Sequence, residues 1–339
     1  MVGFDVSKYQ NVSSSDFLAA GCISGFCGRA CVQPLDVVKV RFQLQVEPIS
    51  TMQESAKYRS IFQAIRCIIK EEGLGAFWKG HLSSQILAVC YSGVQFTSFE
   101  LYTRWCAHLL PKSGEDGEVC QTFASAVNFT CGCLAGVTSA TCTQPLDVLK
   151  TRFIAQGEPR VYNNLREAIT TIARKEGFNG FFRGLSPSLL LTAPQTGLNF
   201  AVYKLTIHLI SLWQTRVLGH PPPDPTNAGL VQSVFAGAFA GMVSKCTVYP
   251  MDVAKKRLQV QGFEEARNHF GSPLIVKGLR DCIVKTWRNE GLEGLFKGLQ
   301  PSILKACLSM GCRFAVYEKV CNFLSYKNTS RASTPTTTG

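Results

Sequence analysis

The sequence lacks the short motifs that mark the commoner enzyme and metal-binding classes. It has 15 cysteines, yet no two have the C-x-x-C spacing of zinc and thioredoxin-like sites, and Cys131 and Cys133 form only C-x-C. No G-x-x-x-x-G-K-S/T phosphate loop and no G-x-S-x-G nucleophile motif is present. These absences argue against a zinc protein, a P-loop hydrolase and an α/β-hydrolase. The thiols are expected to be reduced and to pack as small hydrophobic residues.

Acidic residues are scarce relative to basic ones. The chain has 35 Lys and Arg against 23 Asp and Glu, a formal net charge of +12. A basic chain favours nucleic acid, anionic lipid or an anionic solute as its partner. The bases form no single block or stripe but recur along the chain, which argues against nucleic acid. A basic soluble enzyme or nucleic-acid binder is the alternative from another class.

Charged residues are absent from three long stretches, 81–99, 123–145 and 185–203. A helix needs about 20 mostly apolar residues to cross a membrane, so each stretch is a candidate span. The mean hydropathy of +0.09 is low for helices surrounded by lipid, which indicates that each helix has one face in water. The alternative is that these stretches are buried helices of a soluble enzyme. It is disfavoured because the long helical segments recur along the chain in matching pairs.

One short motif occurs three times, at 34–41, 145–152 and 250–257. Each copy has a proline, an acid two residues later, and bases five and seven residues later. The prolines are 111 and 105 residues apart, a spacing that indicates a triplicated unit. An acid–Gly pair followed by aromatic–base–Gly comes after each copy, at 72–80, 176–184 and 290–298.

Together the two motifs resemble the signature of the mitochondrial carrier family over residues 16–325. The resemblance implies an all-α membrane protein with six tilted transmembrane helices in a threefold pseudo-symmetric bundle and three short matrix surface helices. It implies a monomeric carrier of the mitochondrial inner membrane that is not an enzyme and holds no metal or cofactor. An even number of spans puts both termini on one side, which in the family is the intermembrane space.

The motif positions divide the chain into an N-terminal tail, three carrier repeats and a disordered Ser/Thr-rich tail. These segments are 1–15, 16–110, 118–214, 227–325 and 326–339. The N-terminal tail does not resemble a cleaved presequence. Periodicity, proline and glycine predict a long helix, a surface helix and a return helix in each repeat. The predicted bounds are 16–45, 58–71 and 81–109, then 119–156, 163–175 and 185–213, then 228–260, 277–289 and 299–323.

The acid and the first base of the proline motif are three residues apart and share one helix face. The family resemblance implies that each aspartate pairs with the lysine of the next repeat and closes the pathway on the matrix side. The residues of this matrix gate are Asp36, Lys39, Asp147, Lys150, Asp252 and Lys255. Gln43 and Gln259 match the family's glutamine brace, whereas repeat two has Ile154 there. Ordinary surface pairs, each worth roughly a few tenths of a kcal/mol, are the alternative.

Each return helix has a polar or small residue every three or four positions, which is one helical face. Such a stripe is expected to face the interior or a water-filled cavity. The family's contact level falls on Leu87, Leu191 and Lys305, with Ala88 and Thr192 beside it. The expected substrate site also includes Arg29, Gln95, Gln195, Asn199, Lys245 and Arg313. A charge at the bilayer centre costs about 2.5–3.5 kcal/mol, so Lys305 predicts an anionic ligand. A snorkelling base is the structural alternative.

A second, cytoplasmic gate is expected to be incomplete. The family pattern is aromatic–acid–x–x–base, but Thr103 and Cys321 occupy two of the base positions. The residues assigned to this gate are Glu100, Tyr203, Lys204, Tyr317 and Glu318. No complete ring of ion pairs can form from them, so this side is predicted to close less firmly.

The last glycine of each second motif, Gly80, Gly184 and Gly298, precedes a predicted helix. The free amides of a helix start can bind an anion, and in the family these sites bind cardiolipin. A glycine that only makes a turn is the alternative. Within each repeat, the glutamate of the motif is expected to hold the second base of the proline motif.

The residues alone predict an organic anion, with a phosphate at one end and a less polar ring at the other, as the transported cargo. Residues 42–45, 77–81 and 155–159 resemble the branch of the family that carries thiamine pyrophosphate. That resemblance implies import of this cofactor into the matrix in exchange for nucleotides or other phosphorylated anions. A carrier of coenzyme A or of another nucleotide is the main alternative.

Overall fold

The computed structural model describes residues 14–47, 57–109, 117–158, 160–218, 230–263 and 275–332. These residues are helical or irregular, with no strand among them. Six long helices dominate: α1 (Ser14–Leu44), α3 (His81–Leu109), α4 (Gly117–Ala155), α6 (Leu185–Leu218), α7 (Leu230–Gln259) and α9 (Leu299–Ala332). The predicted all-α class is confirmed.

Shorter helices connect the long helices of each repeat. They are α2 (Ile61–Glu72) and η2 (Leu74–Trp78), then α5 (Leu165–Lys175) and η3 (Phe178–Phe182), then α8 (Leu279–Leu295), which is broken at Gly291. The two 3₁₀ helices were not predicted. Ser60 caps α2 by accepting a hydrogen bond from the Gln63 amide, and Gly73 ends it with φ +77°.

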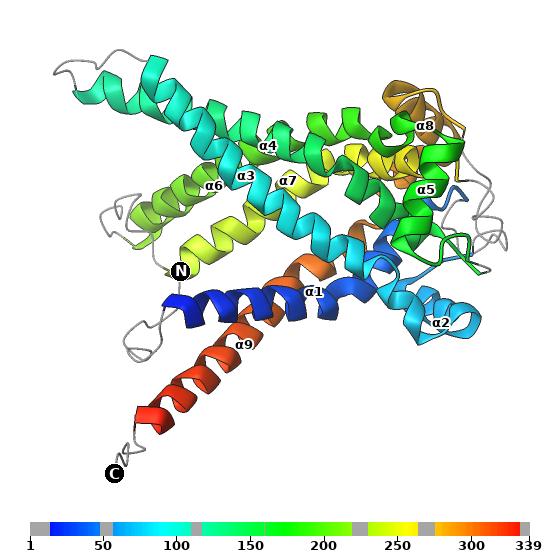
Figure 1. Cartoon of the computed structure of the whole chain (residues 1–339). Helices are drawn as coiled ribbons and strands as arrows, with labels where there is room; N and C mark the ends of the chain where they lie inside the picture. The colour runs from blue at the N-terminus through cyan, green and yellow to red at the C-terminus, as the bar shows by residue number, and fades with distance from the viewer. Residues whose placement is uncertain are drawn as a thin grey trace, which may run out of the picture.

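The long helices form three pairs, α3 with α4, α6 with α7, and α1 with α9 (Figure 1). Each pair joins a return helix to the first helix of another repeat. The pairs diverge toward the end where α1 begins and α9 ends, and they converge at the end that carries α2, α5 and α8 (Figure 1). The hydrophobic core sits at this closed end, where Phe42, Ile154 and Phe263 belong to one buried cluster.

One correction concerns the C-terminal end of α9. Residues 326–332, predicted to be disordered, continue α9 to Ala332, because no proline or glycine interrupts the chain before Pro335. Residues 1–13 and 333–339 of the predicted tails lie outside the described residues, as do 111–116 and 219–226 between the predicted repeats.

The hydropathy of the long helices differs from the expectation drawn from the uncharged stretches. Among the described residues, no helix combines the length and apolar character that a membrane crossing requires. Ser, Thr, Gln and Gly are frequent in these helices, which lowers their mean hydropathy.

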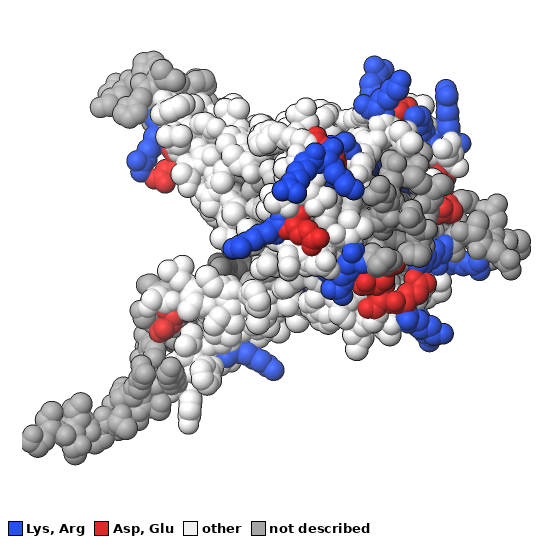
Figure 2. All heavy atoms as spheres, turned by 45° about the vertical axis from the view of Figure 1, so that its right-hand side comes forward, with Lys and Arg blue, Asp and Glu red and all other residues white. Residues whose placement is uncertain are grey.

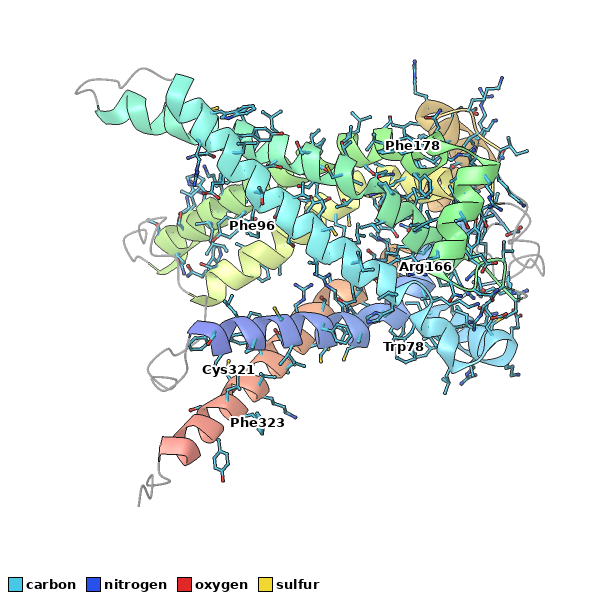
Figure 3. The ribbon with its side chains drawn as sticks, in the orientation of Figure 1. Trp78, Phe96, Arg166, Phe178, Cys321 and Phe323 are labelled. Atoms are coloured by element: carbon cyan, nitrogen blue, oxygen red, sulfur yellow. The ribbon has the colours of Figure 1, made fainter. Side chains whose placement is uncertain are left out.

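Charged side chains are distributed unevenly over the surface. Figure 2 shows Lys, Arg, Asp and Glu gathered at the closed end, with few along the outer faces of the long helices. Arg166 of α5 and Phe178 of η3 lie at this end, whereas Phe323 lies on α9 toward the opposite end (Figure 3).

Candidate functional site

A cavity of about 600 Å³ lies between the long helices, and all six contribute to its lining. Eight of the predicted substrate-site residues line it: Arg29, Leu87, Ala88, Leu191, Thr192, Gln195, Lys305 and Arg313. Among these eight residues, the cations come from α1 and α9, and the apolar side chains come from α3 and α6.

Three predicted site residues, Gln95, Asn199 and Lys245, are not among the lining residues. On α3 the lining ends at Ser92, and on α6 it ends at Gln195, so Gln95 and Asn199 lie closer to the open end. Lys245 is in electrostatic range of Lys39 and Asp252 and belongs with the gate charges. The polar stripe predicted which face of each return helix lines the cavity, but it did not predict how far along the helix the lining extends.

Arg29 and Arg313 both line the cavity, and neither forms an ion pair with a carboxylate among the described residues. The two guanidinium groups are within electrostatic range of one another. A Cβ on Gly28 would lie 2.7 Å from Cγ of Arg313, so glycine at 28 lets α9 bring Arg313 against α1. Two like charges held together without a counter-ion form a site suited to an anion.

Three lysine–aspartate pairs lie at the convergent end of the cavity. Lys39 is 2.6 Å from Asp252, Lys150 is 3.5 Å from Asp36, and Lys255 is 2.8 Å from Asp147. Each pair joins two repeats, and together they link the three repeats in a ring. The structure thus brings together the six residues assigned to the matrix gate, in the pairing that the family resemblance implied.

The glutamine braces contact two of these pairs. Gln43 donates a hydrogen bond to Asp252 at 3.1 Å, and Gln259 donates one to Asp147 at 2.8 Å. Ile154, at the equivalent position of repeat two, is fully buried and has no group to donate. Sequence reasoning missed Lys256, which lies 3.1 Å from Asp147; its place beside Lys255 was the available signal.

A further contact recurs in all three repeats and was also missed. The residue before each motif proline donates to the backbone carbonyl of the base in the second motif. Gln33 donates to Lys79, Gln144 to Arg183 and Tyr249 to Lys297, at 3.3, 2.8 and 3.0 Å. Comparing the position before the proline across the repeats could have found it, because all three side chains can donate.

The glutamates of the second motif hold the second bases of the proline motif. Arg41 makes two hydrogen bonds to Glu72, of 2.5 and 2.8 Å, and Lys79 adds one of 2.6 Å. Arg152 with Glu176, and Arg257 with Glu290, repeat the arrangement. Burial raises the pKa of Glu72, but the hydrogen bonds and charges of Arg41 and Lys79 outweigh it, so the pKa lies below its ordinary value.

The cytoplasmic gate residues are not brought into pairs. Glu100 pairs at 2.5 Å with Arg104, one turn along the same helix, and both side chains are largely exposed. Lys204 on α6 and Glu318 on α9 are exposed as well, while Tyr203 and Tyr317 are half-buried. The open end of the molecule therefore shows no ring of ion pairs within the described residues.

Gly80, Gly184 and Gly298 each have a positive φ, between +75° and +81°. A Cβ on any of them would approach the carbonyl oxygen of a gate lysine, that of Lys150, Lys255 or Lys39, to within 3.0 Å. Glycine is thus required for packing each turn against the next repeat. This geometry explains the glycines structurally and leaves the lipid assignment a prediction.

The family model described as "Mitochondrial carrier protein" matches residues 10–109, 121–212 and 226–328. The chain therefore belongs to the mitochondrial carrier family, and this membership makes it a mitochondrial transporter and not an enzyme.

Curated relatives cover nearly the whole chain. A Macaca fascicularis protein named mitochondrial thiamine pyrophosphate carrier is 45% identical over 329 residues, 97% of this chain and 98% of the relative. The Homo sapiens protein of that name is 44% identical over the same shares of both chains. The mitochondrial thiamine pyrophosphate carrier 1 of Emericella nidulans is 36% identical over 316 residues, 90% of this chain and 91% of the relative.

Proposed function

We propose that the protein imports thiamine pyrophosphate across the mitochondrial inner membrane, in exchange for nucleotides or other phosphorylated anions. The observation that carries this proposal is the cavity, where Arg29, Lys305 and Arg313 face an apolar wall that includes Leu87 and Leu191. A pyrophosphate on an aromatic body matches this division, because phosphate oxygens favour several charge-assisted donors. The names of the relatives support the same cargo.

The mechanism is alternating access. The six long helices are proposed to span the membrane as a tilted threefold bundle of one chain, with their polar faces turned to the cavity. Both termini then face the intermembrane space, because α1 begins and α9 ends at the divergent end (Figure 1). The lysine–aspartate ring lies at the convergent end, which is the proposed matrix side, and its pairs have side chains only 10–20% exposed. Cargo binding opens this ring while the divergent end closes.

Uptake by liposomes that contain the purified full chain tests the cargo. Liposomes loaded with ADP are expected to take up labelled thiamine pyrophosphate much faster than labelled coenzyme A, and unloaded liposomes only slowly. Gln195→Ala should weaken uptake because Gln195 lines the cavity, whereas the control Gln95→Ala should leave it near wild type. Uptake of thiamine pyrophosphate no faster than that of coenzyme A would refute the cargo assignment. Retention of the protein in carbonate-washed membranes tests the spanning arrangement.

Cardiolipin is the proposed lipid partner at the turns that follow Gly80, Gly184 and Gly298. In each turn the glycine carbonyl accepts the first helical hydrogen bond, as from Ser84 to Gly80 at 2.9 Å, so the earlier amides of the helix can face an anion. Added cardiolipin is expected to raise the unfolding temperature of the detergent-solubilised protein more than phosphatidylcholine does. An equal rise in unfolding temperature with both lipids would refute cardiolipin as a specific partner.

A further inference from the structure

The three gate aspartates do not have equivalent partners. Asp252 and Asp147 each combine one lysine closer than 3 Å with a glutamine amide. Asp36 has Lys150 only at 3.5 Å, and Ile154 fills the place of its glutamine. The seam between α1 and α4 is therefore the one whose gate pair is long and unbraced.

Lys305 occupies the vacant place beside Asp36. Its Nζ lies 2.5 Å from Oδ1 of Asp36, while Lys150 approaches the other carboxylate oxygen. Lys305, Asp36 and Lys150 all line the cavity, and the Lys305 side chain is 30% exposed. The lysine at the cargo level is thus bound to a gate carboxylate in this structure.

We infer that Asp36 is the resident counter-ion of Lys305, and that the phosphate of the cargo must displace it to bind. This inference rests on the proposed function and assigns Asp36 a part in selecting the cargo. Once Lys305 turns to the phosphate, Asp36 keeps only the long contact to Lys150. The gate then opens first at the seam between α1 and α4.

The competition favours cargo with a strong anionic group. A pyrophosphate offers more charge and more acceptor oxygens than a carboxylate, and Arg29 and Arg313 line the same cavity. A cargo with a hydroxyl in place of the phosphate offers no charge to replace the broken pair, which leaves Lys305 without a counter-ion in a partly buried place. Unphosphorylated thiamine should therefore neither displace Asp36 nor release the gate.

Calorimetric titration of the detergent-solubilised full chain with inorganic pyrophosphate tests the competition directly. Asp36→Asn removes the competitor and is expected to tighten pyrophosphate binding roughly tenfold, since one hydrogen bond to a charged group changes a dissociation constant by about that factor. Asp252→Asn is the matched control. It removes the same charge from another gate pair, but neither Asp252 nor its partner Lys39 is among the cavity-lining residues, so the affinity should change much less.

The double variant decides whether the effect runs through Lys305. In a Lys305→Gln background, Asp36→Asn should leave the pyrophosphate affinity unchanged. Equal tightening with and without Lys305, or equal affinities of wild type, Asp36→Asn and Asp252→Asn, would overturn the inference. Should Asp36→Asn fail to fold, Ile154→Gln replaces it. A glutamine amide on Asp36 loosens its hold on Lys305, so binding should tighten about threefold, and an unchanged affinity would again overturn the inference.

This titration is independent of the cargo assignment. Liposomes that fail to take up thiamine pyrophosphate would remove the proposed function, yet pyrophosphate binding and its dependence on Asp36 could still be measured. Normal thiamine pyrophosphate uptake together with no Asp36 effect would remove the inference alone.

Discussion

Arg313 is set against α1 by the close packing at Gly28, and it lines the cavity from α9. Arg313→Gln is expected to weaken the binding of thiamine pyrophosphate by roughly 10- to 100-fold, because a charge-assisted hydrogen bond contributes about 1.5–3 kcal/mol. Lys319→Gln, on an exposed position of the same helix, removes the same charge and should change the affinity little. Calorimetry of both variants measures the difference, and equal affinities would show that Arg313 does not contact the cargo.

Glu72 connects the end of α2 to Arg41 of α1 and makes stability depend on pH. Its pKa in the folded protein is below the ordinary value of about 4.3. The carboxylate therefore stabilises the fold fully above that value, and the stabilisation is lost as the pH falls through the lower, folded-state pKa. Glu72→Gln should cost about 3 kcal/mol at pH 7 and flatten the loss of stability as the pH falls below about 4.3.

Glu71→Gln is the control for this experiment. Glu71 pairs with Lys57, but its side chain is 45% exposed, so its removal should cost under about 1 kcal/mol. Unfolding temperatures of the solubilised variants across this pH range provide the measurement. Similar losses for both variants would contradict a special stabilisation by the buried glutamate.

At the scale of elements, each return helix is fixed by the glycine turn that precedes it. Gly80→Ala forces an L-residue to φ +75° and brings its Cβ within 3.0 Å of the Lys150 carbonyl and 3.2 Å of Ile154. A cost of about 2–3 kcal/mol is expected from backbone strain and overpacking. Gly75→Ala meets nothing within 4 Å and has no positive φ, so its unfolding temperature should stay near wild type. Equal unfolding temperatures would mean that the turn adapts.

The helices could be predicted from the sequence because their signals are local. The prolines, Gly73 and the 3.6-residue periodicity place α2, α3 and α5 within a few residues of their observed bounds. Contacts that depend on the tertiary arrangement could not be predicted in this way. Lys305 and Asp36 are 269 residues apart in the chain, and no local pattern indicates that a lysine at the cargo level contacts a gate aspartate. The depth of Gln95, Asn199 and Lys245 was missed for the same reason.

The molecule as a whole combines threefold architecture with three unequal seams. Each repeat contributes two long helices, yet Arg29, Lys305 and Arg313 come from α1 and α9 alone, and the leucines that face them come from α3 and α6. The gate pairs also differ, since two are braced by glutamine and one is supported by Lys305. An asymmetric cargo with one anionic end suits such a cavity, because only one side of the ring of repeats needs to bind the phosphate.

The gate pair between α1 and α4, which has no glutamine brace, is expected to set how fast the matrix end opens during transport. Ile154→Gln places a donor where Gln43 and Gln259 have theirs, and one further hydrogen bond at the gate is worth about 1 kcal/mol. The closed matrix end should become more stable, so the exchange rate in liposomes falls about fivefold while the unfolding temperature rises. Ile154→Met is the matched control, since it has a similar length but no amide and should exchange at nearly the wild-type rate. An Ile154→Gln protein that is more stable yet exchanges as fast as wild type would mean that opening of the seam between α1 and α4 does not limit transport.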